Sequence, residues 1–110
     1  MTLRQKQTKF AQMVAKLLVQ AEIFGYEVTL GEAWRSPETC EMYAAQGKGI
    51  SNSLHQYRLA IDINLFKGGV YLTQTEDYKR LGEWWESIGG SWGGRFNDGN
   101  HFSLEHNSIK

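Results

Sequence analysis

The sequence predicts an α+β fold in which helices lead and a small, mostly antiparallel sheet follows. Apolar residues recur at helical spacing over residues 8–24, whereas they alternate with other residues over 26–34 and 59–65. No strand–helix–strand rhythm repeats along the chain, so a parallel sheet is not expected. We therefore expect one domain, residues 1–110, with helices flanking the sheet.

The first half of the chain is predicted to form a helix, a strand and a second helix. The first helix, 8–24, carries one apolar stripe and stops at Gly25. The stripe consists of Phe10, Met13, Val14, Leu17, Leu18, Ala21 and Phe24. Even-numbered apolar residues then predict a strand over 26–34. Ser36 and Pro37 are typical of a helix start, and this helix should end before Gly47.

The second half is predicted to hold a loop, a strand, a helix and a final strand. After a loop over 47–57, one strand face should carry Leu59, Ile61, Ile63 and Leu65, and the other Ala60, Asp62 and Asn64. A turn at 67–69 leads to a helix capped by Thr75, which Gly89-Gly90 ends. Its buried face should carry Tyr78, Leu81, Trp85 and Ile88. A Gly-rich stretch precedes the last strand, His101 to Glu105.

Composition limits the classes of function. The chain has 12 Lys and Arg against 12 Asp and Glu, so its formal net charge is +0 and nucleic-acid binding is not expected. Its single cysteine, Cys40, excludes an internal disulfide and a cysteine-rich zinc ribbon. We see no signal peptide and no membrane-spanning stretch, so we expect a cytoplasmic product, with no membrane insertion.

Two short stretches carry the residues that indicate chemistry. Asp62 lies between two isoleucines of a predicted strand, where a carboxylate is costly unless it is paired or ligates a metal. A strand with one hydrated face is an equally good interpretation of Asp62 alone. His55, Asp98 and His101 complete a set of two imidazoles and two carboxylates at strand edges. A catalytic zinc site needs three protein ligands and a nearby carboxylate as base.

Other residues admit two interpretations each. Arg35 either closes a surface salt bridge or reaches into a cleft to bind a substrate carboxylate or oxyanion. His106 is a rival ligand, but its spacing of five from His101 places the two on opposite strand faces, so we expect it to be exposed. Trp92 and Phe96 flank the Gly-rich stretch and are candidates to line a cleft.

The combination of motifs resembles the D-Ala-D-Ala carboxypeptidase family of zinc peptidases. The motifs are Ser53-x-His55-x-x-x-x-Ala60-x-Asp62, Asp98-x-x-His101-Phe102, Trp34-Arg35-Ser36 and Trp92-Gly93-Gly94. The resemblance covers roughly residues 26–105 and implies the small α+β fold shared with the Hedgehog signalling domain. One departure is Arg58, where the family commonly has glycine, and we expect its side chain to narrow or re-charge the cleft.

The resemblance also implies roles. His55, Asp62 and His101 would hold Zn²⁺, Asp98 would be the general base, and Arg35 would contact the substrate. Ser53 would support the site by hydrogen bonding, and Ser53 and Arg58 join Arg35 as candidate substrate-binding residues. Since the base is Asp, the chain is most similar to the phage L-alanyl-D-glutamate endopeptidases.

We therefore expect a monomeric zinc peptidase that cuts peptidoglycan stem peptides, at the L-Ala–D-Glu bond, as a phage or prophage lysis enzyme acting on the cell wall after release. A D-Ala-D-Ala carboxypeptidase or dipeptidase of the same family is one alternative. A non-catalytic wall-binding relative is another. A metal-dependent nuclease using His101, His106 and Asn107 is a third, disfavoured by the neutral charge.

Overall fold

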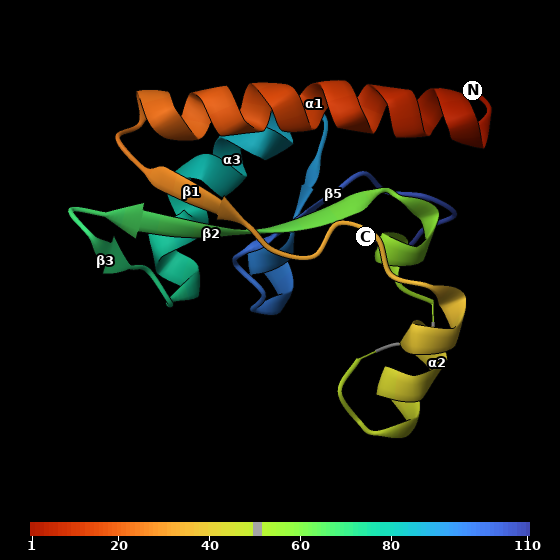
Figure 1. The fold of residues 1–110 in the computed structure, drawn as a ribbon. Coiled ribbons are helices and arrows are strands. Elements are labelled where there is room, and N and C mark those ends of the chain that lie inside the picture. The colour runs from red at the N-terminus through yellow and green to blue at the C-terminus, as the bar shows by residue number, and fades with distance from the viewer. Residues whose placement is uncertain (50–51) are drawn as a thin grey trace.

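A computed structural model describes residues 1–49 and 52–110 (Figure 1). The helices are α1 (Leu3–Ile23), α2 (Pro37–Ala45) and α3 (Lys79–Ser87). The strands are β1 (Glu27–Leu30), β2 (Ala60–Lys67), β3 (Val70–Tyr71), β4 (Ser91–Trp92) and β5 (His101–Ser103). Short 3₁₀ helices are η1 (Leu54–Tyr57), η2 (Thr75–Tyr78) and η3 (Gly93–Phe96). The predicted α+β class is confirmed.

The sheet is antiparallel at every described strand pairing and has the order β1-β2-β5-β4, with β3 pairing to β2. Helices α1 and α3 pack on one face, whereas α2 lies apart from them at the far end of the molecule (Figure 1). The predicted alternation is confirmed over residues 61–65, because Ile61, Ile63 and Leu65 are buried in the core while Asp62 and Asn64 are half-buried. The face that carries Asp62 is therefore the open one. Ala60 was expected on the open face but is buried in the core.

The core forms where the long helix meets α3 and the sheet. Phe10 of α1 contacts Trp85 of α3 edge to face, and Trp85 contacts Phe102 of β5 in the same way, each pair at 6.0 Å between ring centroids. The predicted stripe of α1 is confirmed, with Phe10, Met13, Leu17 and Ala21 buried. Among the described residues, no helix is both long and apolar enough to cross a membrane.

Several predicted boundaries differ from the structure, and four of them bear on the site or its supports. Helix α1 begins at Leu3 instead of residue 8, because Thr2 and Gln5 form a reciprocal capping box. The helix predicted to start at Thr75 is first a turn of 3₁₀ helix capped by Gln74, whose backbone N–H donates to Asp77. The last strand ends at Ser103, so Glu105 lies outside it and is exposed. Residues 50–51 of the predicted loop lie outside the described residues.

The fourth difference is at β1, which ends at Leu30 and not at residue 34. Beyond it, Gly31 N–H donates to Asp62 O at 2.8 Å, and Asp62 N–H donates to Glu32 O at 2.9 Å. A Cβ on Gly31 would lie 2.9 Å from Asp62 O, so this close approach of the two backbones requires glycine. The chain leaves the sheet beside Asp62 and continues to Arg35.

Candidate metal centre and active site

Three side chains converge on the open face of the sheet. Each of His55, Asp62 and His101 offers one ligand atom, and these atoms all lie within 4.8 Å of one another. Asp62 Oδ1 is 3.4 Å from His55 Nε2 and 3.2 Å from His101 Nδ1. Both imidazoles are buried and Asp62 is half-buried, so the set is a pocket of donors and not a surface cluster.

The first histidine is positioned by a 3₁₀ turn. Ser53 caps η1, and its Oγ accepts a hydrogen bond from His55 N–H at 3.2 Å. His55 Nδ1–H donates a hydrogen bond to the carbonyl oxygen of Ala33 at 3.2 Å. The remaining nitrogen, Nε2, is thereby held with its lone pair toward Asp62, an orientation that metal-binding histidines use.

The other two donors are fixed by strand pairing. Asp62 of β2 and His101 of β5 are direct partners in the antiparallel register. The carbonyl oxygen of Asp98 accepts a hydrogen bond from His101 N–H at 3.1 Å, which closes the turn before β5. Within the described part of the chain, His101 Nε2 is buried and lacks a hydrogen-bond partner.

The donor set suits a cation. Because His55 Nδ1–H donates a hydrogen bond to Ala33 O, a neutral His55 presents the lone pair of Nε2 to a carboxylate oxygen at 3.4 Å, an arrangement that needs a proton or a positive ion between the two atoms. Two imidazole nitrogens and one carboxylate oxygen are ligands of catalytic zinc. The residues present therefore fit Zn²⁺.

The pKa shifts of Asp62 and His55 are consistent with a cation-binding site. Burial acts to raise the pKa of Asp62, but hydrogen bonds with His101 and His55 outweigh it and lower the pKa to about 2. Burial acts to lower the pKa of His55, yet the hydrogen bond and negative charge of Asp62 leave that pKa raised. Asp62 is therefore a carboxylate at neutral pH, ready to ligate a cation.

Asp98 lies beside the donors but is more exposed. Its Oδ2 is 3.9 Å from His101 Nδ1, and its side chain is 51% exposed. Burial raises the pKa of Asp98, and the negative charge of Asp62 also raises it, whereas His101 acts in the opposite direction. A carboxyl group with a raised pKa at the rim of a donor set can accept and return a proton.

These groups line a cleft of about 300 Å³. The lining residues are Arg35, Lys48, Gly49, Ser53, Leu54, His55, Asp62, Phe96, Asp98, His101 and Lys110. The cleft thus brings together every predicted metal ligand, the predicted base, Arg35 and Ser53. Its Lys48 and Lys110 were not predicted, because lysines in loops and near chain ends carry no sequence signal for a site.

Arg35 is held from two sides. Its Nε donates to the carboxylate of Glu32, and its guanidinium lies over the ring of Tyr43, 5.1 Å from the centroid. Arg35 N–H also donates to His55 O at 3.3 Å, which ties the residue to η1. Sequence reasoning missed Glu32 and Tyr43, since their contacts depend on the path of the chain after β1. Arg35 therefore forms the expected salt bridge and also lines the cleft.

Arg58 does not line this cleft. Its backbone is left-handed at φ 58°, a conformation that favours glycine, which accounts for the glycine common in the family. Its guanidinium lies 4.7 Å above the centroid of Trp34, and these two residues line a separate small cavity. The expectation that Arg58 narrows or re-charges the metal cleft is therefore wrong.

The structure also tests the expected cleft positions of Trp92 and Phe96 and the expected exposure of His106. Phe96 lines the cleft, with its ring 5.9 Å from that of His101, whereas Trp92 is buried and its Nε1 donates to Gly99 O at 2.8 Å. His106 is half-buried instead of exposed, with its ring 5.4 Å from that of Tyr57. His106 is not part of the described donor group, so the nuclease arrangement is not present there.

An open antiparallel sheet carrying a His-Asp-His donor set beside a titratable carboxylate defines a class of zinc hydrolases. The family model described as D-alanyl-D-alanine carboxypeptidase matches residues 46–104. The chain belongs to this family of zinc metallopeptidases, which act on peptidoglycan.

Solved structures support the fold. The L-Ala D-Glu endopeptidase ChiX of Serratia marcescens is 20% identical, with a TM-score of 0.70 over 86% of this chain and 79% of that one. The vancomycin resistance D,D-pentapeptidase VanY from a VanB-type cassette, a mutant in complex with Zn(II), is also 20% identical, with a TM-score of 0.61 over 87% and 70%. No curated protein matches the sequence.

Proposed function

We propose that this protein hydrolyses the bond between L-alanine and D-glutamate in the peptidoglycan stem peptide. The observation that carries the proposal is the aspartate at position 98, in the cleft beside the donor set. In having an aspartate at this position, the chain resembles the L-alanyl-D-glutamate endopeptidases. The Serratia marcescens neighbour is named for the same bond and has the higher TM-score of the two structures.

The chain's own groups divide the work of peptide hydrolysis. His55, Asp62 and His101 would hold the zinc ion, which when bound supplies a Lewis acid and lowers the pKa of water to about 7. Asp98 accepts a proton from the attacking water and returns it to the leaving amine. Because one chain supplies all of these groups, we propose that the enzyme acts as a monomer.

Arg35 binds the substrate in this scheme. Glu32 and Tyr43 fix its guanidinium, so that the donors not used by Glu32 remain for a carboxylate or an oxyanion in the cleft. Ser53 contributes indirectly in this scheme, since its Oγ already accepts from His55 N–H and holds η1 in place.

Digestion of purified Gram-negative peptidoglycan tests the bond. We expect new amino termini on D-glutamate, identified by mass spectrometry of the soluble products. Release of free D-alanine or D-Ala-D-Ala without new glutamate termini would instead favour a carboxypeptidase or dipeptidase, the alternative that the family's description and the VanY neighbour support. Retained binding to peptidoglycan with no product at all would favour the non-catalytic relative.

We also propose that the enzyme serves phage or prophage lysis and reaches the wall from the cytoplasm. The similarity of the Asp98 motif to phage endopeptidases supports this role. Expression in a Gram-negative host should leave cells intact until the inner membrane is permeabilised, and turbidity should then fall. Lysis without permeabilisation would contradict the proposed route.

A further inference from the structure

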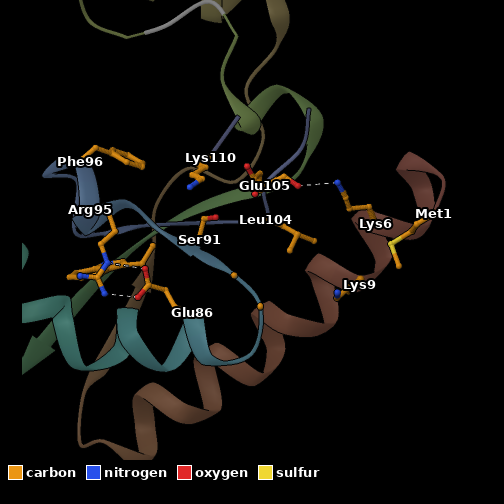
Figure 2. Close-up of a pocket in the computed structure, with 13 residues that line it drawn as sticks. Met1, Lys6, Lys9, Glu86, Ser91, Arg95, Phe96, Leu104, Glu105 and Lys110 are labelled. Atoms are coloured by element: carbon orange, nitrogen blue, oxygen red, sulfur yellow. Dashed lines mark hydrogen bonds and ion pairs between the residues drawn. The ribbon is translucent and has the colours of Figure 1, made fainter. Parts of the chain in front are cut away.

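A second and larger cavity adjoins the metal cleft. It has a volume of about 480 Å³ and shares two lining residues, Phe96 and Lys110, with the cleft (Figure 2). One wall comes from the N-terminal part of α1, and the opposite wall comes from the end of α3 and the segment that follows it. The two cavities are therefore neighbours on the surface.

The larger cavity is basic. Four cationic side chains line it, against the two carboxylates of Glu86 and Glu105. These cations are Lys6, Lys9, Arg95 and Lys110. Glu86 already neutralises Arg95 through two hydrogen bonds of 2.9 and 2.6 Å, drawn as dashed lines in Figure 2.

The lysines keep their charge available. Lys6 Nζ donates to the backbone oxygen of Glu105 at 2.9 Å and contacts His106 Nδ1 at 3.3 Å, neither of which is an anionic group. Lys9 and Lys110 form no ion pair within the described ranges 1–49 and 52–110. Leu104 and Phe96 add apolar surface to the lining. The cavity thus offers both cations and apolar surface, the composition of a site for a ligand with aliphatic parts and carboxylates.

We infer that this cavity binds the carboxylate-bearing, C-terminal side of the stem peptide while the scissile bond lies in the metal cleft. The inference rests on the proposed function. In the stem peptide, the D-glutamate α-carboxylate and all later free carboxylates lie beyond the L-Ala–D-Glu bond. A peptide that passes Phe96 with this end leading brings its carboxylates to the cavity lined by Lys6 and Lys9. Lys6 already donates to Glu105 O, whereas Lys9 has no ion pair among the described residues, so Lys9 is the specificity residue for free over amidated carboxylates.

The test compares two synthetic stem tetrapeptides, one with free carboxylates and one with the same carboxylates amidated. Binding is measured by calorimetry on the full zinc-loaded chain carrying Asp98→Asn, which should slow turnover by about 10²–10⁴-fold. We expect the free-carboxylate peptide to bind about tenfold more tightly than the amidated one, and Lys9→Glu to reduce that preference several-fold, because Lys6 and Arg35 remain. Lys9→Arg keeps the charge and should keep the preference.

Lys16→Glu is the matched control, because Lys16 is an exposed lysine of the same helix that lies outside the cavity. An unchanged preference in Lys9→Glu, or an equal loss in Lys16→Glu, would overturn the inference. Cleavage by the chain with Asp98 intact is assayed separately. A chain that cuts a different bond but shows the Lys9-dependent preference refutes the proposed bond and leaves the basic cavity supported.

Discussion

Asp62 Oδ1 lies 3.2 Å from His101 Nδ1, and these two residues are direct partners across the antiparallel strands β2 and β5. The metal site is thus tied to the register of the sheet. Side chains alternate between the two faces of a strand, so a slip of one residue would move Asp62 to the core face and away from His101.

The first prediction concerns the metal. His55→Ala and His101→Ala should each lose most bound zinc, because each removes one of three protein donors. Metal analysis of purified protein measures this directly. His106→Ala is the control and should retain zinc, since His106 contacts Tyr57 and Lys6 instead. Full zinc occupancy in both ligand variants would refute the donor set.

Zinc should also stabilise the fold. An ion that binds the native chain at 100 times its dissociation constant adds about 2.7 kcal/mol to the free energy of unfolding. Chelation should therefore lower the melting temperature of the unsubstituted chain and leave that of His55→Ala unchanged. Equal melting temperatures with and without chelator in the unsubstituted chain would contradict a site that forms only in the folded state.

Asp98→Asn should keep zinc and fold while losing turnover by about 10²–10⁴-fold, the usual cost of removing a general base. The amide cannot accept the proton, but its size is unchanged and its position at the cleft rim is half exposed. Steady-state hydrolysis of a stem peptide is the measurement. Loss of zinc in this variant would make Asp98 a ligand and not a base.

Arg35→Lys should lower kcat/KM by about tenfold or more, because lysine keeps the charge but lacks the planar guanidinium that forms two hydrogen bonds with a carboxylate. It also loses the geometry with which Glu32 and Tyr43 hold the side chain. Arg58→Lys is the control and should retain kcat/KM, since Arg58 lies over Trp34 outside the cleft. Equal effects of the two substitutions on kcat/KM would contradict a role for Arg35 in substrate binding.

Gly93→Ala should destabilise the protein by about 1–3 kcal/mol and weaken zinc binding. A Cβ at this position would lie 2.3 Å from Asp98 O and 2.7 Å from the Cβ of His101, so the turn that carries both residues must shift. Thermal unfolding and zinc titration measure the two effects. Gly49 also lines the cleft, but a Cβ at this position would lie 3.7 Å or more from its nearest neighbours. Gly49→Ala is therefore the control and should change neither stability nor zinc binding.

The sequence predicted the parts of the site that local patterns control. Alternation placed Asp62 opposite the core face of β2, and the Ser36-Pro37 start positioned α2 correctly. It did not predict where β1 ends, because the bonds of Gly31 and Glu32 to Asp62 join segments distant in sequence. The position of Arg58 was missed for a similar reason, since a left-handed residue redirects its side chain without a composition signal.

The burial of Trp92 has a consequence for how the enzyme turns over. Its indole leaves no space for a Cβ at Gly82 or Gly94, and its Nε1 donates to Gly99 O, next to Asp98. Trp92 therefore ties the segment that bears the base to Gly82 of α3. We therefore expect substrates to be selected by the preset shape and charge of the cleft, and not by closure of this segment over the bound peptide.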